Sequence, residues 1–194
     1  MRVSNDEEHD RFVRFVDERS KLKDMKTLQE VDSSSSQMLQ IVTYHLVFEY
    51  LIEKWIDFKV NNGESMFKGI EKIGFHNKLY IAKNIGMPKN LFNAIDLINR
   101  ERNKFAHQIF KNGMSENEIR KIGKAVDSIT GTNGGKFSGE SGIKVRVKGI
   151  VGYVGADQTN DCDVLMYILL RSLHNHLSNF VFVDIHHSNS REIS

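Results

Sequence analysis

The stretch that decides the fold spans residues 97–107 and reads Leu-Ile-Asn-Arg-Glu-Arg-Asn-Lys-Phe-Ala-His. Apolar residues lead into it and continue through it at spacings typical of an amphipathic helix, namely Leu91, Ile95, Ile98 and Phe105. Arg102 interrupts this stripe where another apolar residue is expected. The pattern predicts a helix over about residues 88–107, with Pro88 at its start and the quoted stretch at its C-terminal end.

Arg102, Asn103 and His107 form the first candidate site. Asn103 and His107 are four residues apart and therefore share a helix face, while Arg102 lies one position round from Asn103. The negative end of the helix dipole favours a charged histidine. Such a cluster can hold a phosphate and transfer protons, so the three residues are candidate catalytic residues. The same cluster also suits a helix cap with a salt bridge.

The composition is that of an ordinary soluble protein. The 194 residues fit a single domain, 40% are hydrophobic and 27% are charged. The formal net charge of +2 is too small to predict nucleic-acid binding by itself. Cys162 is the only cysteine, which excludes an intramolecular disulfide and a cysteine zinc site. Residues 1–8 do not resemble a signal peptide, and charged residues break the most apolar stretch, 41–56. We therefore expect a cytoplasmic protein without a membrane span.

Helical periodicity dominates the chain and predicts an all-α bundle with one small β element. The strict alternation of residues 143–148 predicts a strand, and residues 149–154 complete a hairpin. The glycine-rich segment 131–142 is predicted to be a loop, and residues 180–183 a short strand. The expected helices cover about residues 5–25, 35–60, 65–72, 75–86, 88–107, a segment starting at the capping box Ser115-x-x-Glu118, and 161–178.

Two weaker candidates are rejected on spacing. Residues 134–136, Gly-Gly-Lys, resemble part of a phosphate-binding loop, but no Ser or Thr follows the lysine and no strand precedes the glycines. Four C-terminal histidines also lack a helical three- or four-residue spacing with a carboxylate partner, namely His174, His176, His186 and His187. We therefore predict no cofactor and no metal site.

Two other polar groups each leave two interpretations open. His45 and Glu49 share one face of the predicted helix 35–60, where they form either a polar seam of the bundle or part of the cleft that holds the candidate catalytic residues. Three basic residues alternate along the predicted strand, namely Lys144, Arg146 and Lys148. They either protect an edge strand from aggregation or contact nucleic acid. Glu49 and these three residues are therefore candidate binding residues.

The candidate catalytic motif also carries a family resemblance. Residues 102–107 fit the Arg-x4-His pattern of the HEPN superfamily, including Asn directly after the Arg. Residues 74–86 contain a Phe-x-x-Lys helix that ends in Gly, and residues 97–107 supply an Arg-Asn-x-Phe-Ala-His signature. This combination resembles the mannitol operon repressor (MltR-like) family. Residues 46–53 also resemble the long helix that precedes the signature in that family.

The resemblance is unequal along the chain. It is good over residues 36–112, which correspond to the HEPN/MltR-like core, and loose over residues 115–180. Residues 131–154, with the glycine-rich loop and the hairpin, resemble an insertion into that compact core. The family implies an all-α bundle, often a homodimer with the motif helices facing across the two-fold axis.

The resemblance implies two functions of different classes. In catalytic HEPN proteins the Arg and His form a metal-independent ribonuclease site, as in toxin-antitoxin and defence systems. Here His107 would transfer protons during 2′-hydroxyl transesterification, and Arg102 would hold the phosphate. Asn103 would orient His107 or hydrogen-bond the phosphate. Many relatives are non-catalytic, and MltR-like proteins are named as transcriptional regulators. In that alternative Arg102 would pair with Glu49 or Glu53, and the protein would act through an antitoxin or other protein partner.

Overall fold

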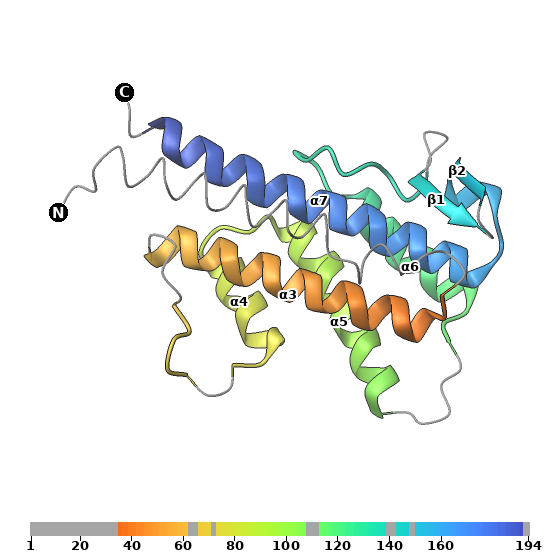
Figure 1. The fold of residues 1–194 in the computed structure, drawn as a ribbon, viewed down its shortest axis with the longest axis horizontal. Helices are drawn as coiled ribbons and strands as arrows, with labels where there is room; N and C mark the ends of the chain where they lie inside the picture. The colour runs from red at the N-terminus through yellow and green to blue at the C-terminus, as the bar shows by residue number, and fades with distance from the viewer. Residues whose placement is uncertain are drawn as a thin grey trace.

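The computed structural model describes residues 35–61, 66–70, 73–107, 113–138, 143–147 and 150–191, and these residues are mostly helical. The predicted all-α class is confirmed at this level. The described chain contains five α-helices (Figure 1), which are α3 (Gln37–Asn61), α4 (Phe75–Asn84), α5 (Lys89–His107), α6 (Glu116–Asp127) and α7 (Cys162–Arg191). The helix predicted for residues 5–25 lies outside the described residues.

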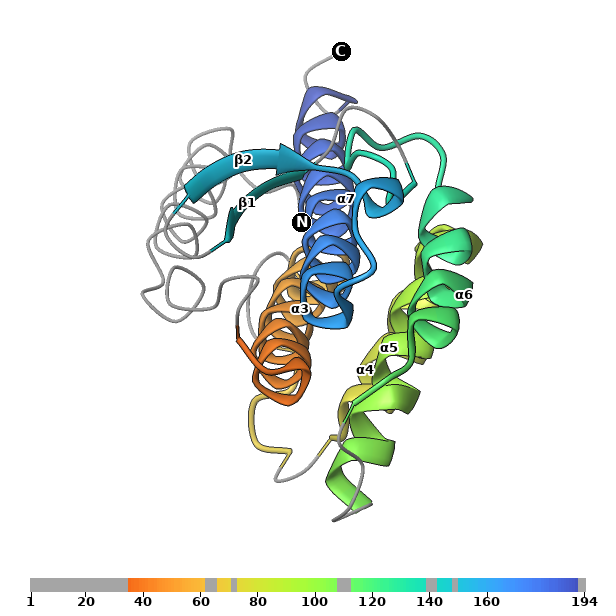
Figure 2. The same cartoon turned by 90° about the vertical axis from the view of Figure 1, so that its right-hand side faces the viewer.

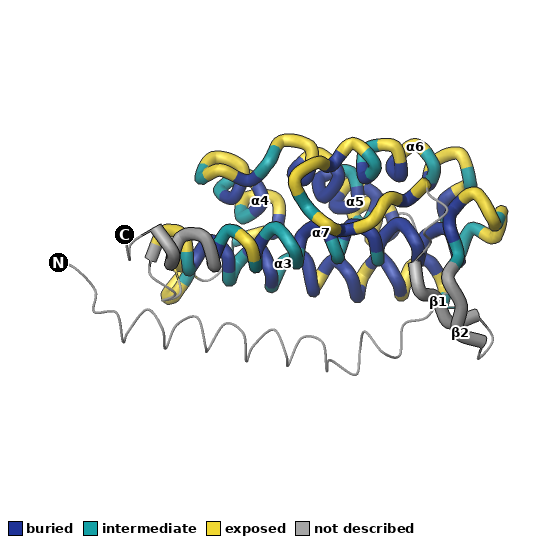
Figure 3. The backbone as a smooth tube through the Cα atoms, turned by 90° about the horizontal axis from the view of Figure 1, so that it is seen from above, coloured by how far each residue is buried: buried dark blue, intermediate teal, exposed yellow. Residues whose placement is uncertain are grey.

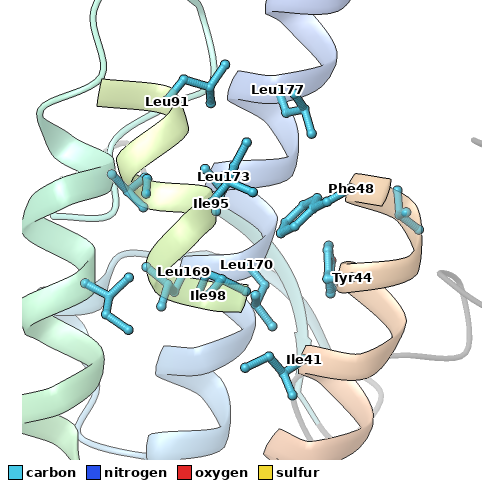
Figure 4. Close-up of a cluster of buried hydrophobic side chains, with 14 of the residues drawn as sticks. Ile41, Tyr44, Phe48, Leu91, Ile95, Ile98, Leu169, Leu170, Leu173 and Leu177 are labelled. Atoms are coloured by element: carbon cyan, nitrogen blue, oxygen red, sulfur yellow. The ribbon is translucent and has the colours of Figure 1, made fainter. Parts of the chain in front are cut away.

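The helices pack in two layers. α3 and α7 lie side by side in one layer, and α4, α5 and α6 form the other (Figures 2 and 3). Apolar side chains of α3, α5 and α7 fill the space between the layers (Figure 4), among them Ile41, Tyr44, Phe48, Leu91, Ile95, Ile98, Leu169, Leu170, Leu173 and Leu177. Full burial of one such aliphatic side chain contributes about 1.5–3 kcal/mol, so this core holds α5 in place.

α3 is apolar over most of its circumference because three other helices cover it. It contacts α4, α5 and α7, and Trp55 and Ile56 are buried in its second half. Two polar residues of α3, His45 and Asp57, are buried as well. A polar group that leaves water needs a hydrogen-bond partner, so these side chains are expected to make specific bonds.

α7 is longer than its sequence pattern predicts. The prediction of a strand over residues 180–183 is wrong, because the helix continues to Arg191. Leu177, Val181 and Ile185 follow one another at four-residue spacing and are fully buried. Packing of this apolar face therefore overrides the β propensity of the Phe-Val-Phe-Val sequence.

Local hydrogen bonds set two other element boundaries. Ser115 and Glu118 form the predicted capping box, in which the Glu118 carboxylate accepts the Ser115 backbone N–H at 2.8 Å. The prediction of a helix over residues 65–72 is wrong for its described part, because residues 66–69 form a turn. The Asp57 carboxylate accepts the Met66 N–H at 2.8 Å, and Gly69 has a φ of 84°, which does not allow a helix to continue.

The segment between α6 and α7 contains an antiparallel pair of strands. β1 (Ile143–Val147) pairs with β2 (Ile150–Val154), and Val145 lies opposite Gly152. Before β1, the described loop residues are bound to α7: Ser172 Oγ donates to the Gly135 carbonyl at 2.6 Å, and His176 Nε2 bonds the same oxygen at 2.8 Å. The short 3-10 helix η1 (Ala156–Gln158) leads into α7.

None of the described helices combines the length and the apolar character that crossing a bilayer requires.

Candidate functional site

The three candidate catalytic residues lie together at the C-terminal end of α5. This end projects away from α7 and from the core of the bundle (Figures 1 and 2). Asn103 and His107 are exposed, whereas Arg102 is half-buried. Arg102 Nη1 donates to Asn103 Oδ1 at 3.3 Å. The structure therefore brings a guanidinium and an amide into contact one turn before an exposed imidazole.

The amphipathic pattern of α5 explains why Arg102 is only half-exposed. Arg102 follows Ile98 by four residues and therefore continues the apolar stripe toward α3. Ile98 is fully buried, and Phe105 is the last residue of α5 that belongs to the core. A long side chain at this position can pack its stem against the bundle and keep its charged group at the surface.

A buried histidine on α3 extends the candidate site inward. His45 Nε2 lies 3.2 Å from Asn99 Oδ1, and its ring centroid is 4.3 Å from that of Phe75. Burial lowers the pKa of His45, and the positive charge of Arg102 acts in the same direction. The Asn99 bond and the charge of Glu49 act to raise it. His45 contacts Asn99 of α5 and Phe75 of α4, and its role as a polar seam or as part of the candidate site stays a prediction.

Asn99 is a site residue that sequence reasoning missed. It lies four residues before Asn103 and therefore on the same helix face, but its side chain is buried. An amide one turn from the motif was the available signal, and the His45 partner is 54 residues away in sequence. Because Asn99 presents its carbonyl oxygen, His45 carries its proton on Nε2 in this contact.

Lys78 occupies both carboxylates that the structural alternative assigned to Arg102. Its Nζ lies 2.8 Å from Glu49 Oε1 and 2.8 Å from Glu53 Oε2. Burial acts to lower the pKa of Lys78, but its bonds to Glu49 and Glu53 outweigh that effect and raise it. Among the described residues no carboxylate pairs with Arg102, so the expected ion pair of Arg102 with Glu49 or Glu53 is wrong.

The binding role of the basic residues in and after β1 remains a prediction. The backbones of Lys144 and Arg146 lie in β1, where they pair with Tyr153 and Val151. Their side chains and the whole of Lys148 lie outside the described residues. Among the described residues, no three His, Cys, Asp or Glu side chains form a group that could hold a metal ion.

We expect the two buried histidines to make folding sensitive to acid. Burial lowers the pKa of His45 and of His176 below the value of an unfolded histidine, about 6.5. Below that value the unfolded chain binds more protons than the folded one, so stability falls as the pH decreases through about 6.5. Each histidine can account for up to about 1 kcal/mol between about pH 7.5 and 5.5. Urea unfolding at the two pH values measures this loss.

His45→Gln provides the matched variant for that measurement, because glutamine can still bond Asn99 but does not titrate. The pH dependence of its stability should be smaller than that of the unmutated protein. An equal dependence in both proteins would show that His45 does not contribute.

The chain matches no protein-family model, and no curated protein or solved structure matches it.

Proposed function

We propose that this chain is a HEPN-type, metal-independent endoribonuclease that cleaves RNA by attack of the ribose 2′-hydroxyl. The observation that carries the proposal is that the Arg102 guanidinium has no carboxylate partner among the described residues. Two other described arginines have carboxylate partners, namely Arg100 with Asp96 at 2.6 Å and Arg120 with Glu116 at 2.7 Å. Arg102 has none among the described residues, and its neighbours His107 and Asn103 are exposed. A guanidinium in this state is available to a phosphate.

The proposed reaction uses one proton transfer at each side of phosphorus. His107 accepts the proton of the 2′-hydroxyl, and the 2′-oxygen forms a bond to phosphorus. The bond to the 5′-oxygen breaks, and this oxygen receives a proton from an imidazolium. Arg102 binds the non-bridging oxygens and stabilises the negative charge of the pentacoordinate transition state. The products are a 2′,3′-cyclic phosphate and a 5′-hydroxyl.

The need for both an acid and a base favours a homodimer. One His107 cannot serve both roles in the same step, whereas a two-fold axis near the end of α5 would supply the partner's His107. His45 is a poor substitute because it is buried and bonded to Asn99. Under this proposal, residues 131–154 with β1 and β2 are an insertion into an HEPN/MltR-like core, and the protein acts in the cytoplasm.

Incubation of total RNA with the purified protein in excess chelator tests the proposal. We expect cleavage at an unchanged rate with and without chelator, since the proposed chemistry uses an imidazole and a guanidinium. The ends should be cyclic phosphates, which resist labelling by a 3′-ligation reaction until acid opens them to monophosphates and a phosphatase then removes the phosphate. RNA that stays intact under all conditions would contradict the enzymatic function.

A second candidate function is a non-catalytic regulator or interaction module. Apolar side chains are exposed on the first half of α3, namely Met38, Leu39, Val42 and Leu46. A contiguous exposed apolar surface is typical of a protein interaction site. Under this alternative an antitoxin or regulatory protein binds the chain, and Arg102 and His107 take no part in chemistry.

A further inference from the structure

The outer side of α4 and α5 carries an aromatic cluster with a cation over it. Tyr80 packs edge-on against Phe92 with ring centroids 5.1 Å apart, and the His76 ring lies 4.6 Å from Tyr80. Lys83 Nζ lies 4.6 Å from the Phe92 centroid and 5.3 Å from that of Tyr80. Tyr80 is 38% exposed although it is a large aromatic residue. Phe92 is buried and so fixes the orientation of the exposed Tyr80 ring.

The surface around this cluster is positively charged. Residues 73–107 contain six Lys or Arg and two acidic residues. Both acidic residues, Asp96 and Glu101, are buried, and each pairs with a basic residue of α5. Lys83 and Lys89 are exposed, and the Arg100 side chain is 65% exposed although it binds Asp96. The described part of this surface therefore presents cations and no exposed carboxylate.

The same side of α5 connects the aromatic cluster to two of the three candidate catalytic residues, Asn103 and His107. Phe92, Asp96, Arg100, Asn103 and His107 follow one another at spacings of three or four and therefore lie along one side of the helix. At 1.5 Å per residue the distance from Phe92 to His107 along the axis is about 22 Å, which is enough for several nucleotides of an extended strand.

We propose that single-stranded RNA binds along this α4–α5 face, defined by His76, Tyr80, Lys83, Phe92 and Arg100, on its way to Arg102 and His107. The inference rests on the proposed function and adds the substrate class and the path of the strand. An exposed tyrosine stacks on a base that is not paired, whereas the bases of a duplex are stacked on each other and are not available. Lys83 and Arg100 contact the phosphates on either side.

Binding is measured by fluorescence anisotropy of a labelled oligouridylate, with a duplex RNA of equal length for comparison. The protein carries His107→Ala, so that the RNA is not cleaved. We expect the single strand to bind more tightly than the duplex. Tyr80→Ala should weaken its binding by about 5- to 150-fold, because stacking of one base is lost, while Tyr80→Phe keeps the ring and the affinity.

Charge and fold controls complete the experiment. Lys83→Ala should reduce the slope of log affinity against log salt by about 0.7, as expected for one lost phosphate contact on a single strand. Lys121→Ala removes an exposed lysine from α6 and should leave the affinity unchanged. Equal affinity of the Tyr80→Ala and Tyr80→Phe proteins, or tighter binding of the duplex, would overturn the inference. The inference would also be overturned if this protein binds no RNA and instead binds another protein through the α4–α5 face.

A dinucleoside monophosphate separates failure of this inference from failure of the proposed function. It is long enough to occupy Arg102 and His107 and too short to reach Tyr80. If the protein with an intact His107 cleaves it and Tyr80→Ala does not change oligouridylate binding, the α4–α5 face is excluded while the enzyme is supported. If it is not cleaved and oligouridylate binding still depends on Tyr80, the binding face is supported and the catalytic function is lost.

Discussion

Replacement of His107 by alanine should lower the rate of RNA cleavage by about 10²–10⁴-fold, which is the usual contribution of a general acid or base. His107 is exposed at the end of α5, so its removal creates no cavity in the core. The melting temperature should therefore change by no more than the surface substitution Lys121→Ala changes it. The measurement is the initial rate of oligoribonucleotide cleavage, together with a thermal unfolding curve of each protein.

His107→Gln is the more demanding version of this experiment. Glutamine keeps a hydrogen-bonding side chain at the helix end but cannot accept and release a proton near neutral pH. If His107 only positions the RNA, the glutamine protein should retain most of the rate. If it transfers protons, both substitutions should be equally damaging. A glutamine variant with full activity would therefore rule out proton transfer by His107 while leaving RNA cleavage itself intact.

The parts of the fold with regular local patterns were predictable from sequence. α5 could be placed because its apolar residues recur at helical spacing, and α6 because a capping box marks its first turn. The end of α7 could not. Residues 180–183 alternate aromatic and β-branched side chains, and only the contact with α3 makes the helix the better structure. The ring centroids of Phe180 and Trp55 are 5.1 Å apart. The Asp184 carboxylate accepts a hydrogen bond from Trp55 Nε1–H at 2.9 Å, across 129 positions of sequence.

In the candidate site, too, contacts within one helix were predictable from sequence and contacts between helices were not. The proximity of Arg102 to Asn103 and His107 follows from helix geometry alone and needed no tertiary information. The cation that binds Glu49 and Glu53 of α3 could not be predicted from sequence. Both Lys78 and Arg102 were positively charged residues within reach of Glu49 in principle, and sequence spacing does not rank two cations on different helices. The packing of α4 against α3 decides for Lys78.

The largest expected loss of stability comes from this lysine. The Lys78 side chain is only 12% exposed and binds Glu49 and Glu53, which lie four residues apart on α3. Lys78→Ala leaves two partly buried carboxylates next to each other without a counter-ion. Breaking a fully buried ion pair costs about 3–5 kcal/mol, and the partial exposure of the two glutamates reduces the expected cost here to about 3 kcal/mol. For a chain of this length that corresponds to a fall in melting temperature of about 6–12 °C.

Two further variants show whether a loss of melting temperature comes from unpaired charges and whether Arg102 is a structural residue. Lys78→Met combined with Glu49→Gln and Glu53→Gln removes the unpaired charges and should recover most of the lost stability, because no ion then lacks a partner. Arg102→Ala should cost less than about 0.5 kcal/mol, since its side-chain bond in the described structure is to the exposed Asn103 at 3.3 Å. Its effect should instead be on RNA cleavage, through loss of phosphate binding. If Arg102→Ala destabilises the protein as much as Lys78→Ala does, Arg102 is a structural residue, and the site at the end of α5 loses its phosphate-binding group.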